Sequence, residues 1–172
     1  MLSFMGVAFG QDREFHLDKI YSISKEGTID LSCTDAKVFI TGSSRVDAHV
    51  KIDRAVTAHG WTTEQSEFSV EVIAENGSLK IREKQEGSDI TFGTYHEDYR
   101  VEIEVPEGMS LKVRGDDGDY FIKNINGNID LSLDDADAEL IDCKGGQFSF
   151  RVYVPFSSRL VSMIRSPSSR FA

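Results

Sequence analysis

A segment that the chain repeats constrains its fold more than any other feature. Residues 27–40 read GTIDLSCTDAKVFI, and residues 127–140 read GNIDLSLDDADAEL. A further copy lies close by, because residues 111–122 align with residues 129–140 when the chain is shifted by 18 positions. Self-similarity of this kind is typical of repeat architectures, in which a unit buries its apolar face only by stacking on the next unit.

Each repeat unit reads as a strand, an acidic turn, a second strand and a polar turn with glycine. Gly108, Gly127 and Gly146 mark the polar turn at intervals of 19 residues. Tight corners favour Gly, Asn and Asp, because these residues tolerate positive φ or bond their own backbone. The register predicts two columns of apolar side chains. The first column contains Leu111, Ile129 and Phe148, and the second contains Ile122 and Leu140.

The rest of the chain alternates apolar and polar residues at the period of a half-buried strand. Residues 67–74 and 77–84 flank an Asn-Gly pair and predict a hairpin. Residues 47–54 and 99–106 read as further strands. Residues 55–66 contain a glycine and adjacent threonines, which favour a loop or a single turn. No segment shows a convincing helical period with caps.

We therefore expect an all-β fold whose second half is a stacked β-repeat, solenoid-like or roll-like. An antiparallel N-terminal portion, at about residues 28–105, is expected to cap this stack or to form its first sheet. A length of 172 residues suits one domain of ordinary size. A hydrophobic content of 40% is sufficient for a core.

The two ends of the chain differ in composition from the middle. Residues 1–10 are apolar, and Ala8 and Gly10 occupy the −3 and −1 positions of a signal-peptidase site before Gln11. Because no basic region precedes them, we interpret residues 1–10 as a truncated signal-peptide remnant, with a buried N-terminal strand as the alternative. This interpretation implies a protein outside the cytoplasm, in the periplasm, on the outer surface or secreted.

Residues 151–172 contain four arginines and no acidic residue. We expect this atypical basic tail to be poorly ordered or foreign to the fold. The alternative is a segment that contacts a polyanion. The repeat-containing domain is then residues 11–150.

The net charge of −10 argues against nucleic acid and anionic lipid as partners, since both are polyanions. No apolar run reaches the roughly 18 residues that a membrane-spanning helix needs, so the chain is not expected to be transmembrane.

Residues 101–113 read VEIEVPEGMSLKV and residues 118–132 read GDYFIKNINGNIDLS. In these segments the chain resembles the bacterial putative adhesin domain family, a β-strand-repeat family of unknown function related to the head domains of autotransporter adhesins. The resemblance covers about residues 15–150 and is strongest over residues 99–150. It implies an exported, non-enzymatic, all-β domain of the cell envelope, and it carries no set of binding residues.

Two acidic clusters invite a calcium interpretation, because hard cations prefer carboxylate and carbonyl oxygens. The calcium candidates are Asp116, Asp117, Asp119, Asp134, Asp135 and Asp137. The sequence has neither the glycine-rich nonapeptide repeat nor EF-hand spacing, and Asp is also an ordinary corner residue. Solvated turns are therefore favoured over a metal site, and no cofactor is predicted.

Catalytic patterns are weak. His96 and Glu97 are adjacent, but neighbouring side chains of a strand point to opposite faces, so an exposed strand is favoured over an acid–base pair. A nucleophile elbow, a P-loop and a dinucleotide fingerprint are absent from the sequence. Five aromatic residues could build a binding patch, although half-buried positions are commoner for them. These are Trp61, Tyr95, Tyr99, Tyr120 and Tyr153.

Cys33 and Cys143 lie far apart in sequence and form no motif. A disulfide is conceivable in an exported protein, but two separate core residues are favoured.

These observations favour a non-enzymatic domain that acts by binding or adhesion to a protein or glycan ligand. Self-association through open sheet edges is a further expectation. The alternatives are a regulatory or sensing module of an envelope-stress system and a carbohydrate-active enzyme on a β-helix. The enzyme is disfavoured because the aspartates are expected at corners rather than within strands.

Overall fold

The computed structural model describes residues 11–63, 67–87 and 90–153. In these ranges the chain is all β, so no helix there is able to cross a membrane. The expected signal-peptide remnant and residues 154–172 of the expected tail lie outside the described residues. The expectation of a tail foreign to the fold is wrong for residues 151–153, which belong to a strand of the sheets. The strands are β1 (Gln11–Ser22), β2 (Thr28–Cys33), β3 (Ala36–Ser43), β4 (Asp47–Thr63), β5 (Glu67–Glu75), β6 (Ser78–Glu86), β7 (Ile90–Pro106), β8 (Ser110–Gly115), β9 (Gly118–Lys123), β10 (Ile129–Asp134), β11 (Ala136–Ile141) and β12 (Phe148–Tyr153).

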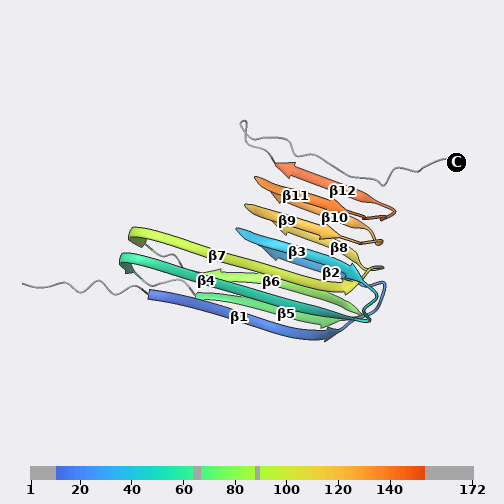
Figure 1. Ribbon diagram of the computed structural model, residues 1–172, viewed down its shortest axis with the longest axis horizontal. Coiled ribbons are helices and arrows are strands. Elements are labelled where there is room, and N and C mark those ends of the chain that lie inside the picture. The colour runs from blue at the N-terminus through green and yellow to red at the C-terminus, as the bar shows by residue number, and fades with distance from the viewer. Residues whose placement is uncertain (1–10, 64–66, 88–89, 154–172) are drawn as a thin grey trace, which may run out of the picture.

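The strands form two mixed sheets that pack on one apolar core (Figure 1). Sheet A has the order β1-β4-β7-β3-β9-β11, and sheet B has the order β12-β10-β8-β2-β6-β5. Each repeat unit gives one strand to each sheet, because a short acidic turn carries the chain from one sheet to the other. The long strands β4 and β7 and the strands β1, β5 and β6 lie together at one end, and β12 lies at the other (Figure 1).

The registers predicted from the repeats are confirmed. In sheet B, Ile129 lies between Leu111 and Phe148 in parallel ladders. In sheet A, Leu140 pairs with Ile122. Ile129 and Leu111 are buried, but Phe148 keeps 38% of its surface exposed although it is in register.

The early copy of the repeat lies directly beside the later copies. β2 pairs in parallel with β8, and β3 pairs in parallel with β9. The expectation that residues 28–105 are an antiparallel portion is therefore wrong for residues 28–43. It is correct for the pairings of β4 with β7 and of β5 with β6, although β6 and β7 also pair in parallel with β2 and β3. The segment from β4 to β7 is inserted between the first and second copies and extends the two sheets on the other side.

Residues 55–66 were expected to form a loop or a turn, and this expectation is wrong for residues 55–63. β4 continues to Thr63, and its antiparallel ladder with β7 extends to the pair Thr63–Ile90. Gly60 lies opposite Gly93 in this ladder. A continuous ladder satisfies the backbone donors and acceptors of both strands, which outweighs the weak strand preference of a single glycine.

The hairpin predicted around the Asn-Gly pair is confirmed. Asn76 has φ 50° and Gly77 has φ 74°, and β5 and β6 flank them. Two consecutive residues with positive φ are typical of the type I′ turn, whose twist matches that of the adjoining strands.

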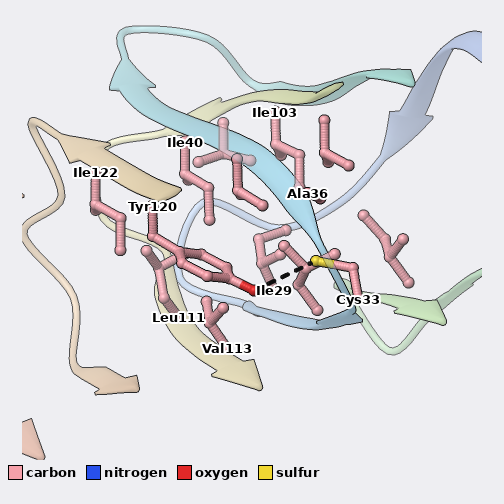
Figure 2. Packing of buried hydrophobic residues seen from close by; sticks show 14 of the residues in the cluster. Ile29, Cys33, Ala36, Ile40, Ile103, Leu111, Val113, Tyr120 and Ile122 are labelled. Atoms are coloured by element: carbon pink, nitrogen blue, oxygen red, sulfur yellow. Dashed lines mark hydrogen bonds between the residues drawn. The ribbon is translucent and has the colours of Figure 1, made fainter. Parts of the chain in front are cut away.

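The interior between the sheets is lined mainly by aliphatic side chains, and a polar contact also lies within it. The Sγ atom of Cys33 and the hydroxyl of Tyr120 lie 3.7 Å apart inside the core (Figure 2). Tyr120 also explains why position 115 is glycine, since a Cβ atom there would lie 1.7 Å from the tyrosine oxygen.

Candidate binding surfaces

The predicted acidic turns lie along one side of the stack, which we call the turn edge. It comprises the three turns that join β2 to β3, β8 to β9 and β10 to β11. The parallel pairs Cys33–Gly115 and Ala36–Gly118 bring the first two turns together. Of the calcium candidates, Asp116, Asp117 and Asp135 lie in these turns, and Asp134 is the last residue of β10.

Asp119 and Asp137 are not at corners, contrary to expectation. They lie in β9 and β11 as direct partners in a parallel ladder. Their side chains are on the outer face of sheet A, because the alternate residues Tyr120 and Leu140 point into the core. The six aspartates therefore divide between an edge and a face.

Asp35 belongs to the turn edge and was missed from the sequence. Its pKa is raised first by burial and next by the carboxylates of Asp117, Glu97 and Asp116. The signal was available, since Asp35 aligns with Asp135 in the duplicated segment, and both residues have positive φ, 40° and 44°.

In the ranges that the structure describes, no group of three or more His, Cys, Asp or Glu side chains is arranged to hold a metal ion. The calcium interpretation therefore stays a prediction that only titration can test.

A second surface, also missed from the sequence, lies on the outer face of sheet A. The rings of Phe39 and Phe121 stack with centroids 4.9 Å apart and planes 11° apart. The guanidinium of Arg100 lies 4.3 Å from the centroid of Phe39. We call these three residues the aromatic cluster.

Charged side chains surround the aromatic cluster in a regular order. In the ladder that contains the two rings, Lys51 and Glu102 precede Phe39, and Glu139 follows Phe121. A cluster of aromatic rings with an arginine, rimmed by charge, is the composition that protein-binding hot spots favour. On a solvent-facing sheet surface such a cluster is more informative than scattered apolar residues.

A third polar site, the buried arginine cluster, lies between the sheets near the turn edge. Its centre is Arg54, which is only 8% exposed. The Nε atom of Arg54 donates to Oε1 of Glu97 at 2.6 Å, and its guanidinium lies 4.2 Å from the ring centroid of Phe68. Tyr95 donates its hydroxyl to the other oxygen of Glu97. All polar groups of the cluster named here are paired, which is typical of a structural ion pair.

The aromatic residues suggested for a binding patch do not gather on one surface. Tyr99 and Tyr120 are buried in the core, and burial raises the pKa of both. Tyr95 is 49% exposed. The side chains of Trp61 and Tyr153 lie outside the described part of the structure.

The prediction that His96 and Glu97 diverge is confirmed. Glu97 bonds to Arg54 between the sheets, whereas His96 is exposed.

The cysteines are separate, as favoured. Both thiols are free, with Cys33 buried beside Tyr120 and Cys143 near the carbonyl oxygens of Ile122 and Ile141. Burial raises the pKa of Cys33 to about 12.

No protein-family model matches the chain, and no curated protein matches it. Among solved structures, the chain is similar to the crystal structure of a putative cell adhesion protein from Clostridium sporogenes. The two chains are 14% identical, the TM-score is 0.47, and the likeness covers 84% of this chain and 73% of the other. A TM-score below 0.5 does not establish a common fold.

Proposed function

We propose that this chain is an exported cell-envelope domain that acts by binding or adhesion to a protein or glycan, without catalysis. In this proposal β2–β3, β8–β9 and β10–β11 are successive coils of a short β-solenoid, and the segment from β4 to β7 caps it. The domain comprises about residues 11–150, as the repeat boundaries suggest, together with the last residues of β12, which extends to Tyr153.

The observation that carries the proposal is the aromatic cluster on the outer face of sheet A. The stacked rings of Phe39 and Phe121 offer apolar area, and Arg100 and the flanking carboxylates offer hydrogen bonds and charge. Aromatic faces and edges stack well on sugar rings and on protein side chains, and arginine pairs readily with carboxylates. The side chains of the interior are mainly aliphatic, so the polar groups available to a ligand are those on the outer faces and the turn edge.

A carbohydrate-active enzyme is the second candidate, because Asp119 and Asp137 are neighbours on a parallel sheet. Paired carboxylates can hydrolyse glycosides when their separation and environment differ suitably. Asp137 is exposed, and Lys37 lies beside Asp119 in the next ladder. An exposed carboxylate and a carboxylate with a lysine on the neighbouring strand resemble an ordinary sheet surface more closely than an active site.

Binding is tested with the purified full chain on a glycan array and on a film of bacterial cell-envelope extract. The double variant Phe39→Ser with Phe121→Ser is expected to lose at least tenfold in affinity. The control is Ile20→Ser, because Ile20 is 64% exposed on the same face of sheet A but lies on β1, far from the cluster in strand order.

Binding that the double variant leaves unchanged would refute the aromatic cluster as the binding surface. Absence of binding to both probes would refute adhesion to the ligands they present. Release of reducing sugar by the wild type, lost in Asp119→Asn with Asp137→Asn, would replace adhesion by the hydrolase.

A further inference from the structure

The two sheets end unevenly at the β12 end of the stack. In the part of the chain that the structure describes, sheet A ends with β11, whereas sheet B continues for one more strand, β12 (Figure 1). At this end of the described residues the two sheets therefore form a step one strand deep. Both β11 and β12 have one edge with no strand beside it within the described residues.

The floor of this step is apolar and aromatic. Phe148 and Phe150 pair with Ile129 and Leu131, whose side chains are each 1% exposed. The two phenylalanines face the same way as these core residues, yet they are 38% and 44% exposed. Their exposure follows from the step, because no strand among the described residues of sheet A lies opposite β12.

The outer faces of the two edge strands carry opposite charges. On β11, Asp137 and Glu139 are exposed beside the edge. On β12, Arg151 is exposed on the outer face, because Phe150 points inward. A strand that resembled β12 would therefore present a cation to the carboxylates of β11.

We propose that the occupant of this step is a second copy of the chain, bound with the same step. A two-fold axis that runs along the strand direction, midway between the sheets, exchanges sheet A with sheet B and reverses the stack. It brings β12 of one protomer beside β11 of its partner, and β12 of the partner beside β11 of the first. Each step fills the other, and both sheets become continuous through the dimer.

The strand directions fix how this junction pairs. The two-fold axis leaves strand direction unchanged, and β11 runs opposite to β12, so β11 and the incoming β12 form an antiparallel ladder. Two pairing registers between the central residues of β11 and those of the partner's β12 keep the apolar side chains of both strands pointing inward. One places Arg151 opposite Asp137, and the other places it opposite Glu139. Either register also packs the phenylalanines of the two protomers against each other across the core.

A second copy fits this step better than an unrelated strand does. One dimer interface provides two charge pairs and covers the exposed phenylalanines of both protomers. The two-fold arrangement is isologous and closed, so it yields a dimer rather than a fibre. It also removes two sheet edges that would otherwise pair indiscriminately. The inference is independent of the proposed adhesion function.

Sedimentation velocity of the full chain, from micromolar to several hundred micromolar concentrations, tests the dimer. We expect the wild type to associate and Arg151→Glu to weaken association about tenfold or more, since two attractive pairs become repulsive. Lys123→Glu makes the same charge change on the outer face of β9, one strand away from the edge, and is expected to associate like the wild type.

Mixing two variants gives the decisive result. Arg151→Glu and the double variant Asp137→Arg with Glu139→Arg are each expected to self-associate about tenfold more weakly than the wild type or worse, because each brings like charges together in its own dimer. Mixed together they are expected to form a heterodimer, since both junctions then pair opposite charges. Recovery on mixing also shows that neither variant was simply misfolded.

Two results would overturn the proposal. One is a wild type that is monomeric at every concentration, as expected if another segment or protein fills the step. The other is a dimer that Arg151→Glu leaves unchanged, which would place the interface elsewhere.

Discussion

Arg54 and Glu97 form an ion pair between the two sheets, with 2.6 Å between Nε and Oε1. They come from β4 and β7, the strands whose great length the sequence did not predict, and the ring of Phe68 from sheet B covers the guanidinium. The pair thus links β4 to β7 within the inserted segment. It lies between the sheets, where water screens charge poorly.

Replacing Arg54 by methionine leaves the partly buried carboxylate of Glu97 with its hydrogen bond from Tyr95 but without a cationic partner. We expect the free energy of unfolding to fall by about 2 kcal/mol, measured by urea denaturation. The double variant Arg54→Met with Glu97→Leu is expected to recover most of this loss, because it removes the unpaired charge. Lys51→Met, which breaks the surface contact of Lys51 with Asp53, should change stability by no more than about 0.5 kcal/mol.

Asp35 predicts a pH dependence of stability. Its pKa is raised in the folded state, so between the ordinary value of 3.8 and the raised value the folded state binds more protons than the unfolded state. Stability therefore falls as pH rises through this window. Asp35→Asn is expected to be more stabilising at pH 7 than at pH 3.5, as measured by thermal melts. A gain in melting temperature that is equal at both pH values would contradict the pKa shift.

The control for this prediction is Asp135→Asn in the equivalent turn. Both positions have positive φ, which asparagine tolerates well, so any conformational gain should be common to the two variants and independent of pH.

Two glycines that precede successive strands of sheet B, 19 residues apart in sequence, are expected to respond differently to alanine. A Cβ atom at Gly127 would lie 2.2 Å from the carbonyl oxygen of Met109, whereas one at Gly146 would meet nothing closer than 3.7 Å. We expect Gly127→Ala to lower the free energy of unfolding by about 2 kcal/mol and Gly146→Ala to change it by less than about 0.5 kcal/mol. Equal effects, measured by urea denaturation, would mean that the second and third units are not packed as described.

The two thiols are expected to differ in reactivity. Because burial raises the pKa of Cys33 to about 12, its thiolate fraction at pH 8 is very small, and its neighbours also block access. Iodoacetamide should therefore label Cys143 at least about 100-fold faster than Cys33, as followed by peptide mass spectrometry. In urea the two rates should converge, and rapid labelling of native Cys33 would contradict its burial.

Calcium is expected to shift the melting temperature by less than about 1 °C at millimolar concentration, since a ligand of the folded state stabilises only if it binds. The turn-edge aspartates are spread over three turns, and we expect solvent rather than a common ligand to screen the repulsion among them. A larger rise that Asp116→Asn with Asp134→Asn abolishes would restore the calcium interpretation.

The repeat made much of the fold predictable. The spacing of 18 residues placed Leu111 beside Ile129, and Ile122 beside Leu140, because in-register parallel strands align equivalent residues. The spatial position of the first copy was not predictable in the same way. Nothing in the sequence of residues 27–40 shows that the segment from β4 to β7 extends the sheets on one side of β2 and β3. This placement leaves the other edge of β3 free to pair with β9.

The candidate binding surfaces also divide into one that could be predicted from the sequence and one that could not. Phe39 and Phe121 each precede an isoleucine in their copies, so aligning those copies would have brought the two rings together. The step at β12 is different, since it depends on which sheet ends first. That property belongs to the assembled sheets and not to any one segment.

The insertion between the first and second copies has a consequence for biosynthesis. As the chain leaves the ribosome, β2 and β3 are made long before β8 and β9, which cover one flank of each. Until residue 123 has been added, Ile29 and Ile40 cannot be fully enclosed, and closing so long a loop delays folding. A nascent chain halted before that point should recruit chaperones that hold unfolded segments.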